Sequence, residues 1–271
     1  VAVVNADEVS NEVARRAWWA MPTAANARCL LRHKDVVEGS MGKELADFLV
    51  EFLPFEEEPR AMIESTRLVL QQGLITDSVR DSLWKKGQRK NALHVGFLKA
   101  IPDSLPVEVA VQPLLEIIET QLSLLENNAL AKLFLRLFSR EGQAYLQTVE
   151  SVMKKPSNQD VVISLFTTLK EYLSSVRPNQ VKYENIQILL ADVNKYTEVT
   201  ATKSDELKEL LEVIPELLPA VKSILVLSLV DESLLSPVFS RTDAIGSLMR
   251  RKLEHIITPL LEEVAVLCNK S

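Results

Sequence analysis

Apolar residues recur at intervals of three and four along nearly the whole chain, which is the spacing of one face of an α-helix. The clearest run is "SDELKELLEVIPELLPAVKSILVLSLV", with apolar positions at Leu207, Leu211, Ile214, Leu218, Val221 and Leu225. The same pattern predicts helices over 40–53, 59–72, 106–126, 143–155, 159–176, 181–199 and 243–268. No segment shows a convincing alternation of apolar and polar residues bounded by turn residues. The sequence therefore predicts an all-α protein.

Prolines divide this pattern into pairs of helices. Because proline lacks a backbone N–H, each one tends to end or begin a helix, and the main proline breaks lie about 45 to 60 residues apart. HEAT-like and armadillo-like repeats have a period of roughly 40 to 47 residues. We therefore expect an irregular antiparallel helical-pair array, a HEAT-like α-solenoid, with a helical bundle as the alternative. The likeness is one of period and helix pairing, and no residue motif of a family accompanies it.

The two ends of the chain differ in composition. All three tryptophans and five of the seven glycines precede residue 100, whereas the remainder is rich in leucine and carries the whole net charge of -6. The segment "IPDSLP" is therefore a candidate boundary. It would separate an N-terminal helical part with Trp- and Gly-containing loops, 1–103, from a Leu-rich helical part, 104–271. One continuous array through both parts is the alternative.

Composition and charge limit the classes of function. With 47% apolar and 25% charged residues, the chain is typical of globular proteins. Its negative net charge disfavours binding of nucleic acid or anionic membranes by the surface as a whole. Uncharged stretches such as "SILVLSLV" are too short to span a bilayer, so we expect no membrane insertion. The opening "VAVVNADEV" does not resemble a signal peptide, and the cytoplasm is the expected location.

Sequence signatures of catalysis and cofactor binding are missing. The histidines His33, His94 and His255 have no partner residue at the spacing of a metal site. Neither G-x-G-x-x-G nor G-x-x-x-x-G-K-[ST] occurs, so nucleotide binding has no motif. The carboxylates form rows on single predicted helices, which is typical of water-facing surfaces. We therefore expect no catalytic residue, no metal and no cofactor, and the sequence favours a protein that is not an enzyme.

One basic stretch runs against the acidic trend of the chain. It is "SLWKKGQRKNALHVGFLKAIP", residues 82–102, where Gly87 predicts a break between two helices. The break makes "KKGQRK" a basic corner, with Arg89 and Lys90 in a first helical turn, where cations oppose the helix dipole. An ordinary solvated helix surface is the alternative. The candidate partner-binding residues in this stretch are Trp84, Lys85, Lys86, Arg89, Lys90 and His94.

A second candidate contact lies in "NEVARRAWWAM". Trp18 and Trp19 differ by about 100° around a helix, so they cannot both sit at the centre of one core contact. Arg15 precedes Trp19 by four residues, which lets its guanidinium cover that ring. Because tryptophan and arginine are enriched at interface hot spots, these three residues are candidates for partner binding. Packing of both rings inside the protein is the alternative.

Three functions fit these observations. The first is a non-enzymatic protein–protein interaction scaffold or adaptor, built from paired amphipathic helices and binding another protein. The second is a nucleic-acid-associated helical-repeat protein that contacts phosphates through the basic 85–90 corner, which the acidic net charge makes weaker. The third is an all-helical enzyme or small-molecule binder with a cavity between helices. The sequence leaves the identity of the partner and the oligomeric state open.

Overall fold

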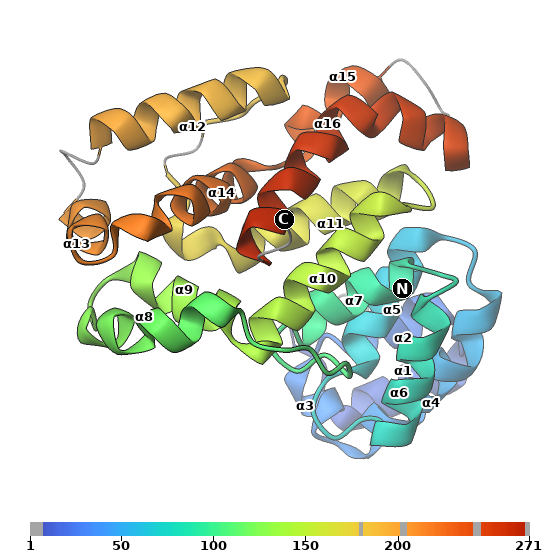
Figure 1. Cartoon of the computed structure of the whole chain (residues 1–271). Coiled ribbons are helices and arrows are strands. Elements are labelled where there is room, and N and C mark those ends of the chain that lie inside the picture. The colour runs from blue at the N-terminus through green and yellow to red at the C-terminus, as the bar shows by residue number, and fades with distance from the viewer. Residues whose placement is uncertain (1–7, 179–180, 201–204, 241–244, 269–271) are drawn as a thin grey trace. The chain divides into compact units, whose positions relative to one another are not determined.

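The computed structural model describes residues 8–178, 181–200, 205–240 and 245–268. Within these ranges the chain forms sixteen α-helices and no strand, which confirms the predicted all-α class (Figure 1). Two compact units, Val1–Ile101 and Pro102–Ser271, divide the chain. The assignment of 1–103 and 104–271 to separate domains stays a prediction. None of the described helices is both long and apolar enough to cross a membrane.

The first unit is built from helices that pack against their near neighbours in sequence. Helix α4 packs against α5, α6 packs against α7, and α5 packs against α7. The predicted helices over 40–53 and 59–72 correspond to α4 and α5. The elements are α1 (Asn11–Ala20), α2 (Ala24–Leu30), α3 (Lys34–Val37), α4 (Ser40–Phe52), the 3-10 helix η2 (Leu53–Phe55), α5 (Pro59–Val69), α6 (Asp77–Gly87) and α7 (Ala92–Ala100).

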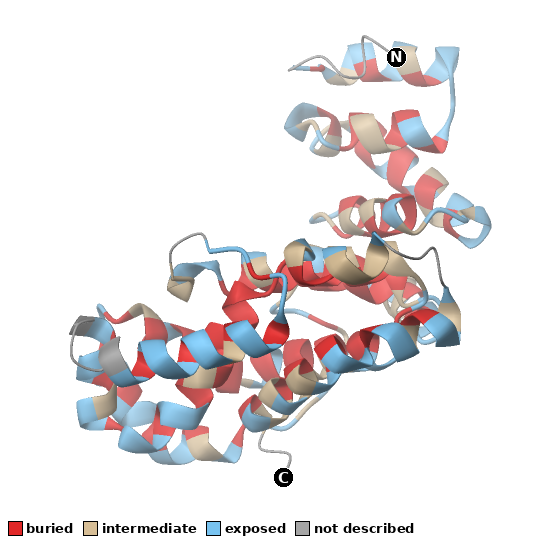
Figure 2. Cartoon of the chain, turned by 90° about the horizontal axis from the view of Figure 1, so that it is seen from above, coloured by how far each residue is buried: buried red, intermediate tan, exposed pale blue. Residues whose placement is uncertain are grey.

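A close approach of two helices holds the first unit together. A Cβ atom at Gly96 of α7 would lie 2.5 Å from Cβ of Thr66 on α5, so glycine is needed where these helices meet. The buried Thr66 hydroxyl donates to the Met62 carbonyl at 2.8 Å, which satisfies its polar atom within the core. Figure 2 shows the outcome for the helices, which turn one face inward and leave the other to solvent.

The second unit is larger. The helices predicted from 143, 159 and 243 begin within three residues of these positions, whereas the helix predicted from 181 begins at Ile186. The largest difference is at the predicted helix over 106–126, which begins only at Pro113. Proline at a first helical position has no N–H to place, and the preceding Gln112 N–H donates to the Phe138 carbonyl at 2.9 Å. The elements are α8 (Pro113–Leu124), α9 (Ala129–Phe138), α10 (Arg140–Lys154), α11 (Gln159–Tyr172), η3 (Ser174–Val176), α12 (Ile186–Thr200), α13 (Asp205–Val213), η4 (Pro215–Leu217), α14 (Leu218–Leu229), η5 (Glu232–Leu234), α15 (Ser236–Phe239) and α16 (Gly246–Leu267).

Helix α14 lies at the centre of the second unit. Its residues from Ser223 to Leu229 are all buried, because it packs against α11, α12 and α16 on different sides. The last helix, α16, packs against α10 as well as α14. The Gln143 side chain of α10 donates to the Leu267 carbonyl at 3.3 Å, across 124 positions of sequence. The second unit is therefore closed by contacts between distant segments.

Short polar side chains fix where several helices begin. At each of these positions a side-chain oxygen accepts a hydrogen bond from the backbone N–H three residues further on, which satisfies a donor that the helix leaves free. These N-cap residues are Ser10, Thr23, Thr76, Asn128, Ser139 and Asn158. The helix starts are thus set by local sequence.

An ionic and aromatic cluster ties Asp103, which lies within the candidate boundary "IPDSLP", to the second unit. Arg136 donates two hydrogen bonds to the Asp103 carboxylate, at 2.9 and 2.6 Å, and its guanidinium lies 3.8 Å above the Tyr172 ring. The Tyr172 hydroxyl donates to Asp103 at 3.1 Å, and its ring stacks on the buried Tyr145 at 3.7 Å. Burial raises the pKa values of both tyrosines, so each stays a neutral hydrogen-bond donor. Asp103 therefore packs with the second unit.

Candidate functional site

The basic corner predicted at 85–90 connects two helices of the first unit. Helix α6 ends at Gly87 and α7 begins at Ala92, as the break predicted at Gly87 required. Lys85 and Lys86 lie in the last turn of α6, where cations complement the helix dipole. Arg89 and Lys90 lie in the turn between the helices. The expected conflict with the dipole of the second helix is therefore wrong, because the first turn of α7 starts after these cations.

The aromatic residues of the corner form its inner side. His94 is 4% exposed, and its Nε2 donates to the Trp84 carbonyl at 3.1 Å. Its ring lies 4.4 Å from the half-buried Trp84 ring, which also meets Phe97 edge-on at 5.1 Å. Burial lowers the pKa of His94, and the hydrogen bond to Trp84 opposes this effect in part. His94 thus packs inside the unit, and Trp84 stands between it and solvent.

Gly87 allows this packing. A Cβ atom there would lie 2.2 Å from Cδ2 and 2.3 Å from Nε2 of the His94 ring. Because the ring is held between Trp84 and the helix backbone, it has little room to move away. Gly87, predicted as a break between two helices, therefore also leaves space for the His94 ring.

An apolar hollow of about 190 Å³ lies under the cations of the corner. We call it the basic hollow, and its walls come from the 52–55 region and from the α6–α7 corner. Its lining residues are Leu53, Pro54, Leu83, Lys86, Arg89, Lys90 and Leu93. The Lys90 ammonium donates to the Pro54 carbonyl at 3.0 Å and so joins the two walls. Phe55, which follows Pro54 in the chain, is 75% exposed. Sequence reasoning found the cations of the hollow and missed its apolar wall at 53 and 54.

The tryptophan pair divides between core and solvent. Trp18 is buried against Phe48, with ring centroids 4.8 Å apart, and its indole N–H donates to Glu44 at 3.0 Å. Trp19 is 75% exposed. The two rings thus do not share one core contact, as their offset of about 100° around the helix predicted. The assignment of Arg15, Trp18 and Trp19 to partner binding stays a prediction.

Arg15 faces another partner than the one suggested by its spacing. Its guanidinium donates to the Glu12 carboxylate at 3.0 and 2.9 Å, and this pairing, together with that of Arg16, lowers the pKa of Glu12 to about 2. Helix α1 packs against α2, α3 and α4, while α7 packs against α5 and α6. The two groups of candidate residues thus lie on different sets of helices.

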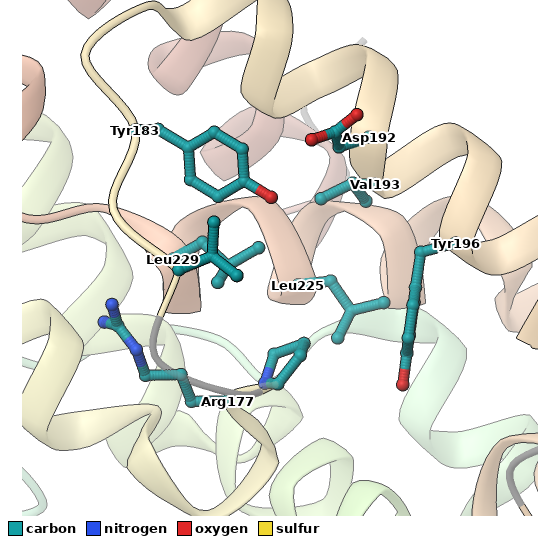
Figure 3. A pocket seen from close by; sticks show the side chains of 9 residues that line it. Arg177, Tyr183, Asp192, Val193, Tyr196, Leu225 and Leu229 are labelled. Atoms are coloured by element: carbon teal, nitrogen blue, oxygen red, sulfur yellow. The ribbon is translucent and has the colours of Figure 1, made fainter.

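A larger pocket of about 460 Å³ lies within the second unit (Figure 3). We call it the tyrosine pocket. It is formed by the segment after η3, by α12 and by α14, and Figure 3 shows Tyr183 and Tyr196 on opposite sides with Leu225 and Leu229 between them. Its lining residues are Arg177, Pro178, Val181, Tyr183, Asp192, Val193, Tyr196, Leu225 and Leu229. Sequence reasoning named only Leu225 among these residues, and only as an apolar position of a helix, because the lining comes from three segments with no shared motif.

Neither feature presents a metal centre. Among the residues that the structure describes, no three His, Cys, Asp or Glu side chains gather as a metal site would need. Comparison with known proteins adds no assignment, since no protein-family model, curated protein or solved structure matches the chain. Function is therefore inferred from the basic hollow and the tyrosine pocket themselves.

Proposed function

We propose that the protein is a non-enzymatic interaction scaffold whose first unit binds an acidic peptide segment of another protein. The observation that carries this proposal is the basic hollow, an apolar depression bordered by three cations. An apolar side chain of the partner enters the hollow, and acidic residues on either side of it meet the cations. This arrangement joins an apolar anchor, which supplies affinity, to charge complementarity, which supplies orientation.

The cations at the hollow are available to a partner. Lys86 and Arg89 are exposed, and neither forms an ion pair with another described residue. Because a partner carboxylate need not displace an existing acid, each contact adds attraction without breaking a bridge. The floor of the hollow is already fixed, since Leu83 and Leu93 are 1% and 3% exposed. A rigid floor reduces the conformational entropy lost on binding.

The peptide proposal is favoured over the nucleic-acid alternative. Phosphate contacts require cations and gain nothing from an apolar hollow, whereas a peptide side chain fills it. Glu57 and Glu58 are exposed in the turn after η2, next along the chain to one wall of the hollow, and they would repel a long polyanion. A short peptide can place its acids on the side of Lys86 and Arg89.

We also propose that the first unit has the predicted arrangement of stacked helical pairs. The pairs α4 with α5 and α6 with α7 meet through the contact of α5 with α7, which is how neighbouring repeats stack. In the second unit, the packing of α16 against both α10 and α14 favours the bundle alternative.

The proposal is tested by fluorescence anisotropy with labelled peptides. The probe is a peptide with one central phenylalanine flanked by glutamates, and the comparison peptide carries lysines in their place. We expect the full-length protein to bind the acidic peptide and to ignore the basic one. The double variant Lys86→Glu, Arg89→Glu should weaken binding by about tenfold or more, because two attractive contacts become repulsive.

A matched variant separates the hollow from the net charge. Lys85→Glu with Lys99→Glu changes the charge by the same amount, at exposed residues of α6 and α7 that do not line the hollow. It should change affinity by less than about threefold. The proposal is wrong if the acidic peptide does not bind, or if this control loses as much affinity as the Lys86→Glu, Arg89→Glu variant. Binding of a labelled oligothymidine strand in place of the peptide would establish the nucleic-acid alternative.

A further inference from the structure

The tyrosine pocket has the size and lining of a site for a small molecule. Its volume of about 460 Å³ falls within the roughly 300 to 1,000 Å³ of ligand pockets. A second hollow of about 200 Å³ shares Arg177, Pro178, Tyr196 and Leu225 with it and therefore adjoins the first pocket. Most of the lining is aliphatic or aromatic, and the polar groups stand at its edges (Figure 3).

Two tyrosine rings give the pocket an aromatic character. Tyr183 is 9% exposed and Tyr196 is 38% exposed, and they lie on opposite sides of the space in Figure 3. Flat aromatic ligands gain from offset or edge contacts with such rings in addition to the apolar area they bury. Leu225 and Leu229 of α14 lie between the rings, so the floor is apolar where the body of a ligand would rest.

Arg177, one of the lining residues, has a hydrogen-bond donor without a partner. Its side chain is 10% exposed, its Nη1 donates to the Ser228 carbonyl at 2.8 Å, and its Nη2 reaches Asp231 at 3.4 Å. The Nε atom is buried and has no hydrogen-bond partner among the described residues. A buried donor without a partner is rare in proteins, because losing its hydration costs free energy. A ligand oxygen that reached this atom would satisfy it.

The charges around the pocket favour an anionic oxygen of the ligand as the hydrogen-bond acceptor. Arg177 shares the buried carboxylate of Asp231 with Lys170, whose ammonium lies 3.7 Å away, so two cations face one anion. The surplus positive charge favours an anionic acceptor at this end. Elsewhere on the lining, burial and the nearby Asp192 carboxylate both raise the pKa of Tyr183, so this end of the pocket carries the negative charge of Asp192. A second negative group on the ligand would be repelled there, so the charges favour a single anion.

We propose that the tyrosine pocket binds a small aromatic monocarboxylate, with its ring between Tyr183 and Tyr196 and its carboxylate at the Arg177 end. This site lies in the second unit and shares no residue with the basic hollow. It is therefore a second binding activity, independent of peptide binding by the first unit. Failure of either proposal leaves the other standing.

Calorimetric titration of the full-length protein tests the site with three probes that differ at one group. The probes are 2-naphthoate, its neutral analogue 2-naphthamide and the cation 2-naphthylmethylammonium. We expect the carboxylate to bind most tightly and the amide about tenfold more weakly, because the bond from Arg177 loses its charged acceptor. The cation should not bind at concentrations up to about 1 mM.

Truncation of Tyr196, the more exposed of the two tyrosines, tests whether the probe binds in the tyrosine pocket. Tyr196→Ala should weaken binding of 2-naphthoate by about tenfold, because one aromatic contact and its buried area are lost. The control is Ile188→Ala, which truncates a side chain on the same helix that is 56% exposed and does not line the pocket. It should leave the affinity unchanged.

Each outcome decides the proposal. It is overturned if 2-naphthoate does not bind, if the amide binds as tightly as the carboxylate, or if Tyr196→Ala binds like the unaltered protein. The three probes are compared on the unaltered chain, so the test of the anion does not depend on the folding of any variant. Benzoate and 4-biphenylcarboxylate, titrated in the same way, should bracket the size of ring that the pocket holds.

Discussion

The basic hollow and the tyrosine pocket use charge in opposite ways. In the first unit, Lys86 and Arg89 are exposed cations above an apolar floor, and they are free to meet a partner. In the second unit, Arg177 is 10% exposed, and two of its nitrogens are already bound within the protein. An exposed charge is screened by salt and chiefly steers association, whereas a buried charge is part of the fold itself.

The two sites also differ in how far apart in sequence their residues lie. Most of the basic hollow comes from the single stretch 83–93, with two residues of η2 added. The tyrosine pocket joins Arg177, Pro178, Val181 and Tyr183 with residues of α12 and α14, two helices that are far apart in sequence and pack together. A change in the first site should therefore act locally, while a change in the second should be felt through much of its unit.

The largest effect is expected from the buried carboxylate of the second unit. Asp231→Asn should lower the free energy of unfolding of this unit by about 3 kcal/mol, because Arg177 and Lys170 lose the only described anion that they share. Asparagine keeps the side-chain oxygen that accepts from the Ser233 N–H, and it places an amide NH2 where Oδ2 faced the two cations, so the variant removes both the charge and that acceptor. Amide hydrogen exchange of the full-length chain, followed on peptides of 102–271, measures the loss.

An exposed ion pair of the first unit provides the comparison. Asp81→Asn removes a partner of Arg80 at 3.1 Å, where both side chains are partly exposed. It should cost less than about 1 kcal/mol, because solvent already screens the pair. Equal costs for Asp81→Asn and Asp231→Asn would show that burial does not separate the two units in the way described.

The next effect comes from the contact of Gly87 with His94. Helix propensity alone predicts that Gly87→Ala stabilises the end of α6 by up to about 1 kcal/mol. The Cβ atom would instead meet the His94 ring at 2.2 Å, so we expect a loss of about 2 kcal/mol. Amide hydrogen exchange, followed on peptides of α6 and α7, shows whether Gly87→Ala raises or lowers the free energy of unfolding.

A double variant identifies the cause of that loss. In a His94→Ala background the ring is absent, and adding Gly87→Ala should then be neutral or stabilising, since propensity alone acts. If Gly87→Ala is stabilising in the unaltered protein, or equally harmful without the ring, the proposed role of Gly87 is wrong. Peptides of 102–271 should be unaffected in either case.

The smallest effect is a dependence of the first unit on pH. Burial holds the pKa of His94 below its ordinary value of 6.5, so the unfolded chain binds a proton more readily than the folded one. Unfolding therefore takes up a proton as the pH falls below about 6.5, and stability decreases until the folded pKa is passed. We therefore expect the urea concentration at the unfolding midpoint, measured by hydrogen exchange on peptides of α6 and α7, to decrease as the pH is lowered from about 7.5 to about 5.

Two substitutions isolate this histidine from the carboxylates that titrate at lower pH. His94→Gln keeps a donor for the Trp84 carbonyl and removes the titration, so it should flatten the profile above about pH 5.5. The exposed His255→Gln in the second unit should leave the profile unchanged. An unchanged slope in His94→Gln would show that another group causes the dependence.

Much of the fold could be read from the sequence because its causes are local. Apolar spacing predicted α4, α5, α10 and α11. The prolines within the apolar run from Leu207 to Leu225 lie where the chain divides into α13, η4 and α14. The predicted helix over 106–126 was too long, because an apolar pattern does not show that the chain is held by a hydrogen bond from Gln112 to Phe138. The spacing of Arg15 and Trp19 likewise gave no hint that Glu12 would take the guanidinium.

By itself the sequence determined the all-α class, the corner at Gly87 and the group of cations on it, because each depends on residues near one another in the chain. Tertiary structure decided what those residues face. It buried His94 under Trp84, brought Leu53 and Pro54 beneath Lys90, and placed Arg177 beside Asp231. Hydrophobic burial is non-directional and depends on total apolar area, so local patterns do not specify which distant helices meet. The contacts between those helices create the basic hollow and the tyrosine pocket.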